Sequence, residues 1–176
     1  EAGGHTGQIA GMALIPQIVD AVKIPVLGAG SIVDGRGMAA ALALGAQGVW
    51  LGTRFAASVE ARAASQYKRR ILEAGSADKI VTRCYSGKPM RVIKNRYVEE
   101  RERHPEDILP FPAQLAASWQ AGLTLYMDDK TTDPERTMMP AGQGIGGIAE
   151  ILPAAEIIDR MVREAQETIR RLSALA

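Results

Sequence analysis

The chain has 176 residues, of which 47% are hydrophobic and 23% are charged, and this composition is typical of a globular protein rather than a disordered one. Lys and Arg (21) balance Asp and Glu (20), and only 5% of residues are aromatic, which argues against nucleic acid as a partner. The longest apolar run, near residues 38–46, has about half of the roughly 18 residues that a membrane span needs, and the single cysteine, Cys84, suits a reducing cytoplasm, where we expect the protein to reside.

The first sixty residues alternate between short β-branched segments that end in glycine and Ala- and Leu-rich segments with helical spacing. This alternation predicts parallel β/α units. Residues 9–22 are expected to be helical, with a break near Ile15 or a helix that begins there, because Pro16 is tolerated best in a first turn. Residues 24–27 are expected to form the first buried strand.

A second β/α unit follows directly. Asp34 is placed to cap a helix that Gly45 would end, and residues 48–51 read as the next strand. Each strand runs into a glycine turn and then a helix. The βαβ arrangement implies a parallel sheet covered by helices.

Beyond residue 60 the pattern changes to longer helices and polar connections, so we expect an inserted, mainly helical subdomain over residues 61–147. Its expected elements are a helix over 61–74, short strands or irregular segments at 81–83 and 90–93, a solvated charge run at 99–107, a helix pair over 114–126 and a polar loop over 128–137.

A final helix is predicted to open at Pro153, and residues 148–176 are expected to pack back on the first sixty. Its apolar residues recur at helical spacing and require a large apolar partner. This stripe consists of Ile157, Ile158, Met161, Val162, Ala165, Ile169 and Leu172.

The turn at residues 3–7 contains the strongest candidate base. Gly3 and Gly4 allow the backbone to approach a flat ligand, and the imidazole of His5 can exchange a proton near neutral pH. The alternative is a flexible turn with an exposed histidine. The other histidine, His104, lies in the charge run and is expected at the surface.

Two glycine turns are predicted to bind phosphate. Gly30 and Ser31 follow the first strand, and Gly52 and Thr53 follow the next, so both turns should emerge at the same edge of the sheet. This is the arrangement of the phosphate site after strands seven and eight of a (β/α)₈ barrel. Neither turn matches the dinucleotide fingerprint or the P-loop.

A third glycine-rich segment, residues 140–147, is either a linker or a loop that lays Gln143 over a ligand. We expect no metal site, because no Cys/His cluster has ligand spacing. Cys84 lacks the basic context of a reactive thiol.

These motifs together resemble the nitronate monooxygenases, formerly called 2-nitropropane dioxygenases. The resemblance covers residues 1–60 closely and extends to residues 141–143. It implies an FMN-dependent (β/α)₈ TIM barrel, of which this chain would be the C-terminal portion, and an enzyme that oxidises alkyl nitronates or nitroalkanes with O₂ to a carbonyl compound and nitrite.

The resemblance also implies roles for particular residues. His5 would be the base toward a neutral nitroalkane, Gly3 and Gly4 would lie against the flavin, and Trp50 and Leu51 would be further flavin contacts. The phosphate would be held by Gly30, Ser31, Gly52 and Thr53. Ser31 replaces a glycine that is common in the family, which is compatible with phosphate binding unless the backbone there must adopt a positive φ.

Three other functions remain open at this stage: a flavin-dependent enoyl-acyl carrier protein reductase, a non-catalytic module that binds a phosphate ligand, and a purely structural α/β fragment. A homo-oligomer is also left open. Because a barrel of this type needs about 250 residues, we expect the isolated chain to expose sheet edges, and to aggregate or fail to bind FMN by itself.

Overall fold

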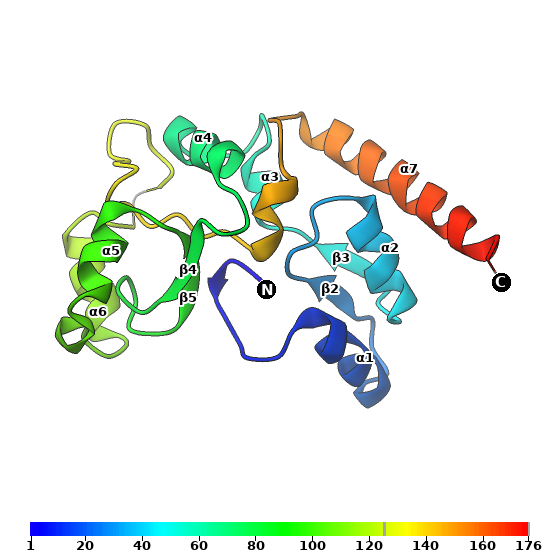
Figure 1. Ribbon diagram of the computed structural model, residues 1–176, viewed down its shortest axis with the longest axis horizontal. Helices are drawn as coiled ribbons and strands as arrows, with labels where there is room; N and C mark the ends of the chain where they lie inside the picture. Colours follow the sequence, from blue (N-terminus) through cyan, green and yellow to red (C-terminus); the bar gives the residue numbers. More distant parts are fainter. Residues whose placement is uncertain (125, 176) are drawn as a thin grey trace.

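The computed structural model describes residues 1–124 and 126–175, and it shows an α/β chain in which two strand-containing parts flank the N-terminal segment (Figure 1). One part is built on the parallel strands β2 (Leu27–Ala29) and β3 (Gly48–Trp50). Its helices are α1 (Gly11–Ala21), α2 (Gly35–Ala43), the short α3 (Thr53–Ala56) and the C-terminal α7 (Ala154–Ser173). The described residues form no closed barrel.

The other part is built on an antiparallel sheet in the order β1-β5-β4. Strands β4 (Lys79–Thr82) and β5 (Met90–Ile93) come from residues between the two β/α units and the last helix, and β1 (Gly4–His5) joins them from the N-terminal segment. The helices of this part are α4 (Ser65–Glu73), α5 (Arg96–Glu102), α6 (Ala113–Gln120) and the 3₁₀ turns η1 (Pro105–Asp107) and η2 (Gln143–Gly147).

The first helix does not break at its proline, so that expectation is wrong. Helix α1 runs from Gly11 to Ala21 with Pro16 inside it. Ala10 begins the helix by accepting a hydrogen bond from the Leu14 N–H at 2.9 Å. A proline at this position deletes a single donor of the ladder, and α1 is exposed enough, with no buried residue, to adapt around it.

Strand β2 begins three residues later than expected and includes Gly28, which the sequence had assigned to a turn. Gly28 is buried, and an added Cβ would lie 3.0 Å from the Ala41 Cβ and 3.2 Å from Ile15 Cδ1. The glycine therefore lets α1 and α2 pack closely on the strand.

The predicted ends of the second helix are confirmed. The Asp34 carboxylate accepts hydrogen bonds from the N–H groups of Arg36 and Gly37, both at 3.0 Å, as an N-cap does. Gly45 adopts a φ of +93° directly after the helix, which is the left-handed conformation that ends many helices.

Residues 114–126 were expected to form a helix pair, but the described residues contain only α6 there, and Leu125 lies outside them. Gly122, with a φ of +70°, turns the chain out of the helix, and its N–H donates to Trp119 O. The charge run at 99–107 covers the end of α5, residues 103–104 and η1. Most of its residues are exposed.

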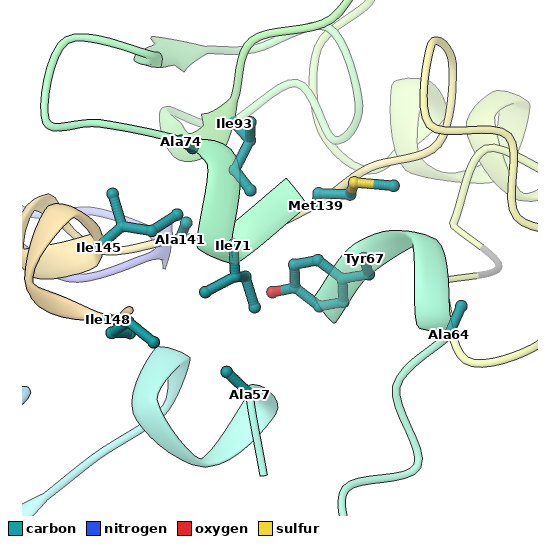
Figure 2. Close-up of a cluster of buried hydrophobic side chains, with 10 residues drawn as sticks. All are labelled: Ala57, Ala64, Tyr67, Ile71, Ala74, Ile93, Met139, Ala141, Ile145 and Ile148. Atoms are coloured by element: carbon teal, nitrogen blue, oxygen red, sulfur yellow. The ribbon is translucent and has the colours of Figure 1, made fainter. Parts of the chain in front are cut away.

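Two hydrophobic clusters hold the chain together. The larger is centred on Tyr67 and Ile71 of α4, which project between Ala57 below and Ile93 and Met139 above (Figure 2). Its other members are Ala64, Ala74, Ala141, Ile145 and Ile148, so this cluster joins segments from both parts of the chain. The smaller cluster lies within the β4–β5 part and consists of Cys84, Tyr85, Met90, Val92, Val98 and Leu123.

The apolar stripe of the last helix is only half covered. Ile157, Met161 and Ala165 are buried, and α7 runs alongside α2 (Figure 1). Four other members of the stripe are exposed: Ile158, Val162, Ile169 and Leu172. None of the helices in residues 1–124 and 126–175 is long and apolar enough to cross a membrane.

The contact between α2 and α7 depends on Gly35, and this generates a prediction. A Cβ at Gly35 would lie 2.4 Å from Met161 O, from Ala165 N and from Glu164 Cβ. We expect Gly35→Ala to force the helices apart and to lower the free energy of unfolding by about 1–3 kcal/mol, measured by urea denaturation.

Gly37→Ala is the matched control in the same helix. Its Cβ would approach Ile32 Cγ2 only to 3.3 Å, and alanine gains about 1 kcal/mol of helix propensity over glycine. Equal destabilisation by the two variants would show that the close approach at Gly35 is not what holds α7.

Candidate functional site

A cavity of about 480 Å³ lies at the ends of the two parallel strands, between them and the segments that follow. This volume falls in the range of small-molecule and cofactor sites. The residues that line it include Ala2, Gly3, Gly30, Ser31, Trp50, Leu51, Gly52, Thr53, Arg62, Tyr67, Tyr126, Met127, Pro140, Gly142 and Gly144.

The parallel pairing of β2 with β3 brings the two glycine turns to one place. Ala29 lies opposite Trp50 in the register, so the turns that follow leave the sheet side by side, and both line the cavity. The N–H groups of Ser31 and Thr53 make no hydrogen bond to any residue in the described part of the chain. Two unengaged backbone donors at one wall of a cavity are a feature that anion-binding sites share.

Ser31 adopts a φ of +57°, the left-handed conformation in which the family glycine would be unstrained. For a residue with a Cβ, this conformation is about 1–2 kcal/mol less stable than a right-handed one. The Ser31 hydroxyl donates to Glu1 O at 2.9 Å and accepts from the Gly144 N–H at 3.1 Å. Each hydrogen bond contributes about 1 kcal/mol, so the two bonds offset the backbone strain.

The glycine-rich segment at residues 140–147 packs directly on both turns. The Gly142 N–H donates to Thr53 Oγ1 at 3.1 Å, and the Gln143 N–H donates to Glu1 O at 2.9 Å. A Cβ at Gly144 would lie 2.5 Å from Ser31 O, so only glycine permits this approach. The segment is therefore a wall of the site rather than a free linker. The side chain of Gln143 is exposed, and Gln143 is not among the cavity-lining residues.

The turn that carries His5 borders the cavity through Ala2 and Gly3. Gly3 lies against the backbone of Ala141, where a Cβ would approach the carbonyl carbon to 2.6 Å. Gly4 adopts a φ of +73° and, with His5, pairs with β5. His5 is exposed, does not line the cavity, and has its Nε2 2.7 Å from the Ser86 hydroxyl oxygen.

The lining residues that were not identified from the sequence include Arg62, Tyr67, Tyr126 and Met127. Tyr67 and Tyr126 stack edge to face with ring centroids 5.8 Å apart, and the Tyr67 hydroxyl donates to Pro140 O. Burial raises the pKa of Tyr67 far above its ordinary value, so its hydroxyl stays protonated. Helical spacing could have placed Tyr67 on the buried face of α4, but nothing local indicates that this face closes a cavity.

Arg62 is the single charged residue among the cavity-lining residues that the structure describes. No hydrogen bond or ion pair within residues 1–124 and 126–175 engages it. Its guanidinium is therefore available to an anionic ligand.

No group of three His, Cys, Asp or Glu side chains that could hold a metal occurs among the described residues. Cys84 is buried, and burial raises the pKa of its thiol to about 11, which keeps it protonated.

Ser31 combines a left-handed backbone with two hydroxyl hydrogen bonds, and substitutions can separate these two features. Ser31→Ala keeps a Cβ at a φ of +57° and removes both hydroxyl bonds, so we expect the free energy of unfolding to fall by about 1–2 kcal/mol in urea denaturation. Ser31→Gly also removes the bonds but relieves the backbone strain. It should be about 1 kcal/mol more stable than the alanine variant, and the reverse order would contradict the account of the strain.

Comparisons with known proteins bear on this site. The family model for nitronate monooxygenase matches residues 1–164. A probable nitronate monooxygenase of Bacillus subtilis is 38% identical over 176 residues, which covers 93% of this chain and 49% of that protein. A putative monooxygenase of Mycobacterium tuberculosis, Rv1533, is 36% identical and covers 99% of this chain and 48% of its own length.

Solved structures agree with this relationship. FabK from Thermotoga maritima superposes with a TM-score of 0.87 at 37% identity, over 99% of this chain and 55% of its own. A nitroalkane oxidase from Streptomyces ansochromogenes superposes with a TM-score of 0.80 at 31% identity, over 97% of this chain and 51% of its own. The chain thus spans about half the length of the relatives that it matches, and it belongs to the nitronate monooxygenase family of oxidoreductases.

Proposed function

We propose that this chain carries the phosphate-binding turns and the catalytic histidine of an FMN-dependent enzyme that oxidises alkyl nitronates with O₂ to a carbonyl compound and nitrite. The observation that supports this most directly is the pair of adjacent turns at Ser31 and Thr53, whose N–H groups make no hydrogen bond among the described residues and which line the same 480 Å³ cavity.

The residues present fit a flavin mononucleotide. The terminal phosphate would be held by Gly30, Ser31, Gly52 and Thr53, because unengaged N–H groups suit an anion. Gly52 keeps this wall open, since a Cβ there would meet no atom within 4 Å. Arg62 would add the positive charge that the neutral N–H groups lack. The bound flavin supplies the oxidation and reduction chemistry.

The remaining wall would surround the flavin ring and the substrate. Gly3 would lie against the ring, with Trp50 and Leu51 as apolar contacts. Gly4 and Gln143 do not line the cavity, so their proposed contacts with the flavin rest on the family resemblance alone. The tyrosine pair and Met127 add apolar surface, which helps to exclude water from the reacting atoms.

His5 is the proposed base for substrates that still carry the proton to be removed. A nitronate is already an anion and needs only to be bound and oriented, whereas a neutral nitroalkane must first lose a proton from carbon. The imidazole is the side chain suited to accept that proton near neutral pH.

A second candidate is an enoyl reductase, which the high structural similarity to FabK from Thermotoga maritima favours. The two activities differ in the electron donor. Anaerobic mixing with NADH should bleach the flavin rapidly in a reductase and slowly in a nitronate-oxidising enzyme. A non-catalytic phosphate-binding module would give no turnover in either assay.

The complete reading frame that carries this chain tests the proposed function. We expect a yellow, FMN-containing protein that consumes O₂ and releases nitrite from propionate 3-nitronate. His5→Asn should reduce kcat for a neutral nitroalkane roughly 100-fold or more, and should reduce kcat for the corresponding nitronate far less, because only the nitroalkane needs a base.

His104→Asn is the matched control, since His104 is the other histidine and lies exposed in the charge run. It should leave both activities unchanged. Equal losses on the two substrates in His5→Asn would reject the base assignment, and absence of nitronate-dependent nitrite release in the wild type would reject the function.

The charge of Arg62 is tested separately. We expect Arg62→Gln to weaken FMN binding roughly 3- to 10-fold, the effect of a partly exposed charge pair, and to leave the binding of riboflavin unchanged, because riboflavin lacks the phosphate. Titration followed by flavin fluorescence measures both affinities.

Arg69→Gln is the control for a change of net charge, because Arg69 is exposed on α4 and does not line the cavity. A similar loss of riboflavin and FMN affinity in Arg62→Gln would mean that the guanidinium does not act on the phosphate.

A further inference from the structure

We propose that Ser86 is a positioning residue for His5: its buried hydroxyl accepts a hydrogen bond from the Nε2–H of the imidazole and so leaves Nδ1 as the atom that takes a proton from substrate. This inference rests on the proposed function, because it concerns the same base.

The contact between the two side chains is short and comes from residues far apart in the chain. The distance from His5 Nε2 to Ser86 Oγ is 2.7 Å, and 81 positions separate the two residues in the sequence. Ser86 is only 1% exposed, whereas His5 is exposed. One edge of the ring is therefore held by the protein while the other edge has no partner among the described residues.

Backbone hydrogen bonds and the Arg83 side chain hold the Ser86 turn in addition to the contacts of the hydroxyl with Lys88. The N–H groups of Ser86 and Gly87 both donate to Arg83 O, at 3.2 and 2.7 Å, and the Arg83 side chain donates to Gly87 O at 3.0 Å. Gly87 has a φ of +80° and lies against the backbone of Phe111, where a Cβ would approach the nitrogen to 2.3 Å. Loss of the hydroxyl should therefore leave the turn where it is.

The histidine is fixed by its backbone as well. His5 pairs with Met90 in the sheet, and the following N–H, that of Thr6, donates to Pro89 O at 3.0 Å. Strand β5 thus carries the turn and the imidazole on one rigid support. What the hydroxyl adds is control over the orientation and the protonation of the ring.

The direction in which the hydroxyl proton points is coupled to the tautomer of the ring. Ser86 Oγ also lies 3.3 Å from Lys88 O, which can only accept, and 3.3 Å from Lys88 N, which can only donate. If the hydroxyl donates to Lys88 O, it accepts from His5 Nε2–H, and Nδ1 then keeps its lone pair. If instead the hydroxyl donates to His5 Nε2 and accepts from the Lys88 N–H, the ring proton is on Nδ1, and Nδ1 could not act as a base.

The arrangement assigned here also suits the protonated ring. When Nδ1 takes up a proton, the Nε2–H still donates to Ser86, so no hydrogen bond is broken as the charge forms. A third group that orients a histidine in this way is a recurring feature of catalytic bases. Ser86 contacts the proposed base through the hydrogen bond to His5 and does not itself line the cavity, so it is a positioning residue.

Nitrogen NMR of the imidazole tests the tautomer without any substrate. In the flavin-loaded protein from the complete reading frame, the difference spectrum against His5→Asn isolates the His5 signals at a pH where the ring is neutral. We expect the Nε2–H tautomer in the wild type and a mixture of tautomers in Ser86→Ala. An Nδ1–H tautomer in the wild type, or an unchanged spectrum in Ser86→Ala, would overturn the proposal.

Kinetics test the consequence for proton transfer. Ser86→Ala should lower kcat for a neutral nitroalkane roughly 10-fold, less than loss of the base itself, with kcat for the nitronate and the FMN content within about twofold of the wild type. Equal losses on both substrates would indicate a structural role and reject the positioning role.

Ser118→Ala is the matched control, because Ser118 is also 1% exposed but belongs to α6 and has no contact with His5. It should leave the ratio of the two kcat values unchanged. A wild type that turns over neither substrate would reject the proposed function, and the NMR experiment would still decide the assignment of the tautomer.

Discussion

The parallel pairing of β2 with β3 is the constraint on which the rest of the site depends. Because the two strands run in the same direction and in register, the glycine turns that follow them must leave the sheet at the same edge. Both turns then line one cavity, and the N–H groups of Ser31 and Thr53 have no hydrogen-bonding partner in the described part of the chain. An antiparallel pairing of the same residues would put the turns at opposite ends of the sheet and leave no anion site.

The same two residues connect the glycine turns to the rest of the fold. Their backbone N–H groups have no partner among the described residues, while their hydroxyls accept hydrogen bonds from Gly142 and Gly144 of the glycine-rich segment. Ser31 performs the second task at the cost of a left-handed backbone. The family glycine would avoid that strain but would provide no hydroxyl. The serine therefore carries a less favourable backbone conformation and, in return, forms hydrogen bonds that link distant segments.

The sequence by itself determined the units from which the site is built. The spacing between the glycine turns equals one β/α unit, and this local regularity predicted the parallel pair because a crossover of that length admits few other arrangements. Asp34 and Gly45 mark the ends of α2 because capping depends on neighbouring backbone groups alone. The family resemblance, which the comparisons confirm, rests on the same local motifs.

Only the tertiary structure decided what surrounds those units. The hydrogen bond between His5 and Ser86 joins residues 81 positions apart, and no periodicity encodes such a contact. Tyr67 reaches the cavity because α4 packs on segments from both parts of the chain, and Arg62 reaches it from the segment that precedes α4. The positive φ of Ser31 is tolerated because Glu1 and Gly144 satisfy its hydroxyl. Local sequence specifies elements and caps, whereas contacts between distant segments depend on how the whole chain packs.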